Sequence, residues 1–221
     1  TFEYTVTEAG NNTFTFAVGK SSRAVTVPVT KLENVFSEYT TQLELKLTAA
    51  NRSNNELHPN QWVSGQYSTV FNNVEFGSQD GWQNGKLVLK AGESIDINYA
   101  PLATKGPKTI EITFSTANVI DENETIMSLS NGVGYKITAS GASLTASDGS
   151  KIETKFKSGE EHKIAAIINS ATGVSDAALA FFVVDGVLDR AVNYDVYADF
   201  INPNTIHIGG TNCDVLIKSI R

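Results

Sequence analysis

The sequence contains very little cysteine: Cys213 is the one thiol in 221 residues. A single cysteine excludes an intrachain disulfide framework, and it excludes any metal site built from several thiolates. The stability of such a chain does not depend on an oxidising compartment. This cysteine usage therefore suits a bacterial or phage protein better than an animal extracellular one.

The chain also lacks long apolar runs and clusters of basic residues. No stretch is long enough and apolar enough to cross a bilayer as a helix. The 17 basic residues are scattered and are outnumbered by 24 acidic residues, which gives a net charge of −7. A chain of this charge without a basic cluster is not expected to bind nucleic acid or an anionic membrane.

Signatures of catalysis are missing as well. The sequence has no phosphate-binding loop, no dinucleotide-binding fingerprint and no nucleophile elbow. The three histidines, His58, His162 and His207, lie far apart and outside any recognisable motif. His207 stands between Ile206 and Ile208, so it faces solvent if the two isoleucines face the core. We therefore expect these histidines to be structural rather than catalytic.

Short alternating runs of apolar residues fill most of the chain. With 41% hydrophobic residues the chain can bury a substantial core. No segment has a sustained helical period, and residues 175–180 form the one plausible helical turn. The runs predict strands at residues 42–47, 70–76, 86–90, 95–99, 109–114, 125–129, 135–138, 143–145 and 151–156, and in four blocks between 161 and 221. This spacing predicts an all-β, two-sheet antiparallel sandwich of the jelly-roll type.

Two glycine-containing turns separate the C-terminal blocks. Asp185-Gly186 lies between apolar runs and has the composition of a two-residue type I′ hairpin, which needs positive φ at both positions. Gly209-Gly210 ends the next block, where we expect a turn that only glycine makes without strain.

The first 30 residues also alternate and predict three strands, with turns at Gly10–Asn12 and Gly19–Ser22. Three strands alone are marginally stable, so we expect them to need a partner. This segment resembles the last strands of a bacterial immunoglobulin-like module. We therefore place an N-terminal β segment with its linker at residues 1–37 and the main domain at residues 38–221.

The four C-terminal blocks resemble the concanavalin A-like (laminin-G-like) family. In that family a His-hydrophobic-Ala strand precedes a strand ending in hydrophobic-Asp-Gly, a short Ile-x-Ile-Gly strand and a closing strand. The corresponding blocks here are His162–Ala165, Phe182–Gly186, Ile206–Gly209 and Val215–Ile220. The resemblance implies a jelly-roll domain.

The main domain is also similar to concanavalin-like modules of phage structural proteins. The features that carry this similarity are Leu43–Leu47, Gly81-Trp82, Leu87–Gly92 and Thr109–Phe114. It implies an adhesion or decoration module of a phage tail or capsid-associated protein, or of a bacterial surface protein. Such a module would lie on the virion or the cell surface, and its partners would be host polysaccharide and other subunits.

A saccharide site needs a flat apolar platform with directional polar groups at its edge. Tyrosines and Trp82 offer such platforms, whereas we expect Trp62 to lie in the core. Amide and carboxylate side chains close to Trp82 in the sequence would bind hydroxyls. The candidate carbohydrate-binding residues are Trp82, Tyr67, Asn84, Asp80 and Tyr99.

Calcium is the one cofactor that the resemblance implies. Laminin-G-like and pentraxin-like relatives hold Ca²⁺ at the rim of the sandwich with Asp side chains and backbone carbonyls. Asp121 and Asp148 are the candidate ligands, since hard cations bind several oxygens. Asp148 precedes Gly149, and ordinary turn chemistry also explains that pair.

The resemblance raises an enzymatic alternative, because one branch of the family contains retaining glucan hydrolases. These enzymes carry alternating carboxylates on one strand, about 5 Å apart. The candidate strands, residues 95–98 and 110–114, lack a second carboxylate two positions on. We therefore expect a non-enzymatic glycan-binding module. A structural module that donates residues 1–30 to a neighbouring subunit is the second hypothesis, and a glycan hydrolase is the third.

Overall fold

The computed structural model describes residues 10–18, 21–29, 43–99, 108–129, 134–145, 151–169, 179–193 and 205–221. The regular elements in these ranges are all β-strands. Within the same ranges, no helix is long and apolar enough to cross a membrane. The chain divides into two compact units, Thr1–Gln42 and Leu43–Arg221.

The first unit contains a two-stranded antiparallel hairpin. Strands β1 (Gly10–Val18) and β2 (Ser21–Val29) pair over nine positions, from Gly10 with Val29 to Val18 with Ser21. The predicted turn at Gly10–Asn12 is wrong, because each of these three residues has a partner in β2 and extends β1. The strand predicted around residues 2–6 lies outside the described residues.

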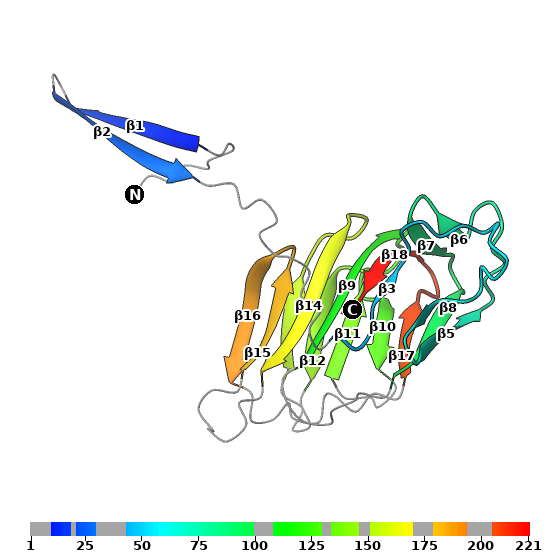
Figure 1. The fold of residues 1–221 in the computed structure, drawn as a ribbon. Coiled ribbons are helices and arrows are strands. Elements are labelled where there is room, and N and C mark those ends of the chain that lie inside the picture. The colour runs from blue at the N-terminus through cyan, green and yellow to red at the C-terminus, as the bar shows by residue number, and fades with distance from the viewer. Residues whose placement is uncertain are drawn as a thin grey trace. The chain divides into compact units, whose positions relative to one another are not determined.

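The second unit is a sandwich of two antiparallel sheets (Figure 1). Sheet I has the order β13 (Lys151–Lys155), β12 (Gly141–Thr145), β11 (Gly134–Thr138), β10 (Thr125–Leu129), β17 (Thr205–Gly209), β8 (Ser94–Asn98), β5 (Tyr67–Asn72) and β4 (Val63–Ser64). Sheet II has the order β16 (Val187–Asn193), β15 (Leu179–Val184), β14 (His162–Asn169), β9 (Lys108–Ala117), β18 (Asp214–Ile220), β7 (Lys86–Leu89) and β6 (Gly81–Gln83), with β3 (Leu47–Thr48) also paired to β18. This architecture confirms the predicted all-β, jelly-roll-like sandwich.

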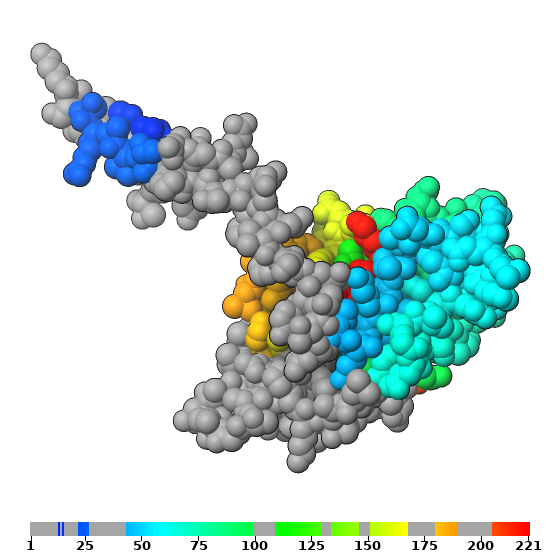
Figure 2. All heavy atoms as spheres, in the orientation of Figure 1, coloured from blue at the N-terminus to red at the C-terminus, as the bar shows by residue number. Residues whose placement is uncertain are grey.

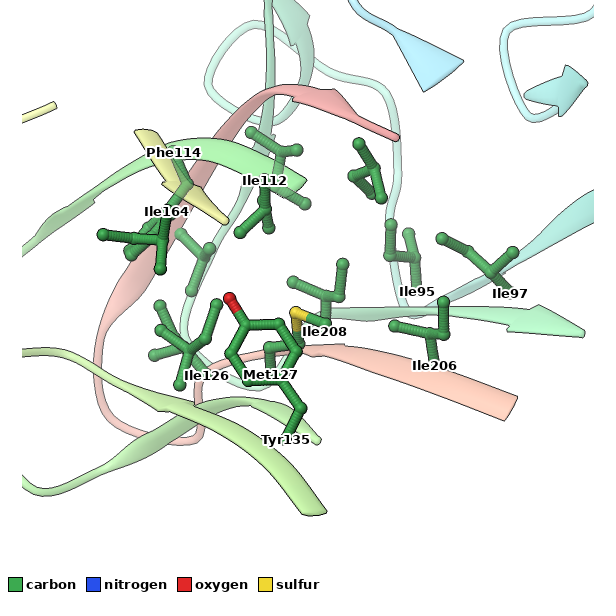
Figure 3. Close-up of a cluster of buried hydrophobic side chains, with 14 of the residues drawn as sticks. Ile95, Ile97, Ile112, Phe114, Ile126, Met127, Tyr135, Ile164, Ile206 and Ile208 are labelled. Atoms are coloured by element: carbon green, nitrogen blue, oxygen red, sulfur yellow. The ribbon is translucent and has the colours of Figure 1, made fainter. Parts of the chain in front are cut away.

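The core forms where the inward residues of both sheets meet. Alternation puts every second side chain of a strand on one face, so Ile95 and Ile97 of β8 are fully buried. Ile112 of β9 approaches them from the opposite sheet, and Figure 3 shows these side chains together with those of β10 and β17. Removal of this apolar surface from water is the main term that stabilises the sandwich.

The hairpin predicted at Asp185-Gly186 is confirmed. Both residues have positive φ, 52° and 84°, and they connect β15 to β16. Gly209 and Gly210 are needed for a different reason than the expected turn. A Cβ at Gly209 would lie 2.4 Å from the backbone oxygen of Glu93, and one at Gly210 would lie 2.5 Å from that of Cys213. Close backbone approach therefore explains this glycine pair.

The strand predicted at residues 42–47 is much shorter in the structure. Leu45, Leu47 and Ala49 are buried in alternation, as the pattern predicts. Leu47 and Thr48 pair with β18, and the backbone N–H of Ala49 donates to the Lys218 carbonyl oxygen at 2.9 Å. The backbone N–H of Lys46 donates to Ser64 Oγ at 2.8 Å. In the predicted helical turn at 175–180, residues 175–178 lie outside the described residues and the last two begin β15.

Candidate functional site

A polar cleft of about 540 Å³ lies between the loop at residues 75–80 and the start of β18. A second hollow of about 430 Å³ adjoins it and shares five of its lining residues. The loop belongs to a continuous surface that residues 43–90 form on the second unit (cyan in Figure 2). The residues that line the two hollows are Glu75, Gly77, Ser78, Gln79, Asp80, Gln83, Asn84, Val88, Lys90, Glu93, Ala117, Asn118, Asp214 and Leu216.

Asp80 holds the wall of this cleft in shape. Its carboxylate accepts hydrogen bonds from the backbone N–H groups of Gly77 and Glu75, the latter at 2.8 Å. Asn54 completes the support: its Nδ2 donates to the backbone oxygens of Gly77 and Asp80, and its Oδ1 accepts from the N–H of Trp82 at 2.6 Å. The predicted site residue Asp80 therefore borders the cleft, but its oxygens are already engaged.

Two carboxyl groups meet in the cleft. Partial burial, the first cause, raises the pKa of Glu93, and the neighbouring Asp80 carboxylate raises it further. Burial alone would also raise the pKa of Asp80. Its backbone hydrogen bonds and the side-chain hydrogen bond with Glu93 outweigh burial, so the pKa of Asp80 is lowered. As the pH falls, Glu93 is therefore protonated before Asp80.

Asp214 fixes the opposite wall. Its side chain is almost completely buried and forms an ion pair with Lys90 at 3.0 Å. It also accepts hydrogen bonds from the backbone N–H of Ala91 at 3.1 Å and from Asn118 Nδ2 at 2.9 Å. This carboxylate connects β18 to the segments that follow β7 and β9.

Ser78, Gln79 and Asn84 are the side chains left for a ligand. All three are exposed, and among the described residues their side chains have no hydrogen-bond partner. Val88 and Leu216 form a small apolar floor beneath them. An arrangement of amide and hydroxyl groups over a small apolar surface is suited to a polyhydroxylated ligand. Of the five predicted carbohydrate-binding residues, the cleft contains Asp80 and Asn84.

The three predicted aromatic residues lie elsewhere. Trp82 is only 4% exposed, because its pairing with Leu87 turns it toward the core, where its ring meets that of Trp62 at 5.2 Å. Tyr67 is also 4% exposed and packs against Tyr99 at 5.2 Å. Trp82 and Tyr67 are therefore core residues, and Tyr99 is half-buried against them. The prediction that Trp62 is a core residue is confirmed.

Of the two predicted calcium ligands, the structure describes Asp121. Asp121 is exposed, and its Oδ1 accepts a hydrogen bond from the backbone N–H of Asn123 at 2.9 Å, which closes a local turn. Asp148 lies outside the described residues. Across the ranges that the structure describes, no group of three or more His, Cys, Asp or Glu side chains is arranged to hold a metal ion.

The rings of His162 and His207 each lie within hydrogen-bond distance of a carboxylate, whereas His58 is exposed. His162 is buried at the start of β14, with Nδ1 2.8 Å from an Asp185 oxygen and Nε2 2.8 Å from the Lys157 carbonyl oxygen. His207 faces solvent, as predicted, and its Nδ1 lies 2.7 Å from Asp96 Oδ1 on the neighbouring strand. Sequence reasoning missed this pair, because its members are 111 residues apart.

No protein-family model and no curated protein matches the chain. Among solved structures it is similar to the binding domain of botulinum neurotoxin serotype D/C VPI 5993, at 13% identity and a TM-score of 0.55, over 80% of this chain and 47% of that one. It is also similar to the botulinum neurotoxin DC binding domain in complex with SialylT, at 13% identity and a TM-score of 0.56, over 80% and 46% of the two chains.

A type C botulinum neurotoxin structure matches similarly, at 12% identity and a TM-score of 0.56, over 80% of this chain and 46% of that one. That toxin is described as needing two ganglioside molecules to enter cells. This chain spans about half the length of the structures that it matches. At this level of identity the likeness establishes the fold alone.

Proposed function

We propose that this chain is a non-catalytic adhesion or decoration module that binds host polysaccharide. It would belong to a phage tail or capsid-associated protein or to a bacterial surface protein. The observation that carries the proposal is the polar cleft, where Ser78, Gln79 and Asn84 are exposed without partners in the described structure and Lys90 lies beside them. Directional groups of this kind bind sugar hydroxyls.

The fold supports the proposal. The similar solved structures are binding domains, one of them in complex with SialylT and another from a toxin that interacts with gangliosides. A binding role without chemistry therefore agrees with those of the similar binding domains. Such a module acts on the surface of a virion or cell, where its partners are glycans and neighbouring subunits.

A structural or oligomerising module is the second candidate, and the hairpin of the first unit favours it. Two strands alone are marginally stable in water. All the side chains described in this hairpin, including Val25 at 43% exposed, lie open to solvent. If pairing with another subunit is the function, the whole chain will self-associate in analytical ultracentrifugation and will bind no glycan.

The hydrolase alternative finds less support. Glu93 and Asp80 are close enough to interact, but Asp80 accepts backbone hydrogen bonds and Glu93 accepts one from the Lys90 N–H at 2.7 Å. Carboxyls bound in this way support the loop rather than flank a glycosidic bond. Release of reducing sugar from any bound polysaccharide would overturn this conclusion.

A glycan array on the purified chain tests the proposal, with and without Ca²⁺ because Asp121 stays a proposed ligand. We expect binding that is lost in the double variant Gln79→Ala, Asn84→Ala. The matched control is Asn60→Ala, Gln61→Ala, which removes the same two side-chain types from exposed positions outside the cleft. Equal binding by both double variants would remove the cleft from the proposal.

A further inference from the structure

The outer face of sheet I gathers three lysines and a histidine from strands that are separate in the sequence. We define the lysine face as Lys136 of β11, Lys151 and Lys155 of β13, and His207 of β17. All four are exposed, while their strand neighbours, such as Ile137, point into the core. The protein as a whole is acidic, with a net charge of −7, so this grouping is unlike its average surface.

The three lysines on this face outnumber its two carboxylates, Glu153 and Asp96. Glu153 forms an ion pair with Lys151, and this hydrogen bond lowers the pKa of Glu153. Asp96 accepts from His207 Nδ1 at 2.7 Å and from Asn72 Nδ2 at 2.9 Å. Within the described ranges, neither Lys136 nor Lys155 forms an ion pair.

The outer face of sheet II provides a contrast. There Glu161 binds both Lys86 and Lys218, each at 2.9 Å. Glu111 binds Lys163 at 3.0 Å. Lys86, Lys163 and Lys218 therefore have carboxylate partners, whereas Lys136 and Lys155 of sheet I form no ion pair with the described residues. Placing like charges on one face adds nothing to folding, which points to a ligand of opposite charge.

The register of sheet I places Lys136 and His207 in one row across the strands, and Lys151 and Lys155 lie on either side of Glu153 at the end of that row. One residue from each of six neighbouring strands contributes, and five strand spacings of about 4.8 Å give a row of roughly 24 Å. The row consists of Glu153, Ser143, Lys136, Ser128, His207 and Asp96. Small serines separate the long side chains, so the row is a shallow path suited to an extended chain.

His207 adds a hydrogen-bond acceptor to the path. Nδ1 of His207 lies 2.7 Å from Asp96 Oδ1, and in the tautomer that donates there the other ring nitrogen, Nε2, accepts from a hydroxyl. Ser128 lies directly opposite His207 in the neighbouring strand. The order Ser-His-Asp is that of a hydrolase relay. However, the backbone N–H groups of β10 and β17 pair within the sheet, so the geometry supports binding rather than acyl transfer.

We propose that the lysine face binds an acidic polysaccharide. Its sugar carboxylates pair with Lys136 and Lys155, and a sugar hydroxyl donates to His207 Nε2. This inference rests on the proposed glycan-binding function and names a second site, on the sheet opposite Val88 and Leu216 of the cleft. Charge complementarity with Lys136 and Lys155 fits a uronate-containing chain, whose carboxylates repeat along an extended polymer.

The test measures the binding of a hyaluronan oligosaccharide to the whole chain by calorimetry, with dextran of equal length as the neutral probe. We expect hyaluronan to bind and its affinity to fall with added salt. Replacing Lys136 and Lys155 with Met keeps the apolar stems and should lower the affinity about tenfold. The matched control, Lys86→Met with Lys163→Met, makes the same charge change on sheet II and should leave the affinity unchanged.

The outcomes separate this inference from the cleft. Loss of hyaluronan binding in the Lys136 and Lys155 variant, with binding kept by Gln79→Ala, Asn84→Ala, supports the lysine face and overturns the cleft as the acidic-sugar site. The reverse pattern overturns the lysine face and leaves the proposed function standing. An equal loss of hyaluronan affinity in the control variant would show that the net charge of the protein, and not the lysine face, causes the effect, and would overturn the inference. Binding to phosphatidylserine vesicles but not to hyaluronan would also overturn it.

Discussion

Replacing Trp82 with Ala is expected to unfold the end of the sandwich rather than to remove a ligand contact. The indole ring is only 4% exposed and meets Trp62 edge-on at 5.2 Å. Its Nε1 donates to the Pro59 carbonyl oxygen at 2.7 Å, and the Arg52 guanidinium lies 4.5 Å from its ring centre.

The expected loss follows from these contacts. Truncation of a buried aromatic residue costs about 3–5 kcal/mol, and the unmade hydrogen bond to Pro59 adds about 1 kcal/mol. Trp82→Phe keeps most of the ring packing and should cost roughly 2 kcal/mol. Urea unfolding followed by far-UV circular dichroism measures both variants without depending on indole fluorescence.

A loss below about 1 kcal/mol in Trp82→Ala, with an unchanged urea dependence, would refute this reasoning. It would mean that the ring contributes little to the core and is available at the surface. If the large loss is found, reduced glycan binding by Trp82→Ala says nothing about direct contact. The exposed pair Gln79 and Asn84 is then the informative place to mutate.

Two further variants test the loop that borders the cleft. Asn54→Asp puts a carboxylate oxygen, in place of an N–H donor, against the carbonyl oxygens of Gly77 and Asp80. The free energy of unfolding, measured with urea, should fall by about 2–3 kcal/mol. An effect near zero would show that the loop does not depend on these hydrogen bonds. Glu93→Gln should stabilise the protein at pH 7 by less than about 1 kcal/mol. The pKa of Glu93 is raised in the folded state, so ionisation of this carboxyl destabilises the fold as the pH rises above the ordinary pKa of 4.5. The gain in stability from Glu93→Gln should therefore vanish below that pH. A gain that persists at pH 3 would contradict the raised pKa of Glu93.

Much of the fold follows from local sequence patterns. The short runs at residues 125–129 and 151–156 predict strands, and β10 and β13 form there within a residue of the expected bounds. Asp185-Gly186 adopts the predicted turn because few other pairs tolerate positive φ at both positions. Residues 42–47 also alternate, yet most of them do not pair, because a ladder needs a partner strand and the pattern does not reveal which strand is available.

The candidate site was much less predictable. Asp80 and Asn84 border the cleft and are close together in the sequence. Asp214 lies 134 positions after Asp80, and the folding of the sandwich places both residues at the same cleft. Trp82 has the composition of a binding residue and is nevertheless buried, because its pairing with Leu87 in β6 and β7 decides which way the ring points. Facing direction in a strand depends on register, and register is a property of the assembled sheet.

The sequence by itself determined the class of the molecule: alternation with period two, glycine and aspartate turns, and a single cysteine allow an all-β sandwich without disulfides. Tertiary structure alone decided which polar groups meet. Lys136 and Lys155 are not a basic cluster in the sequence, and His207 and Asp96 are 111 residues apart. Sheet pairing brings each set onto one face, because neighbours in a jelly roll come from distant parts of the chain.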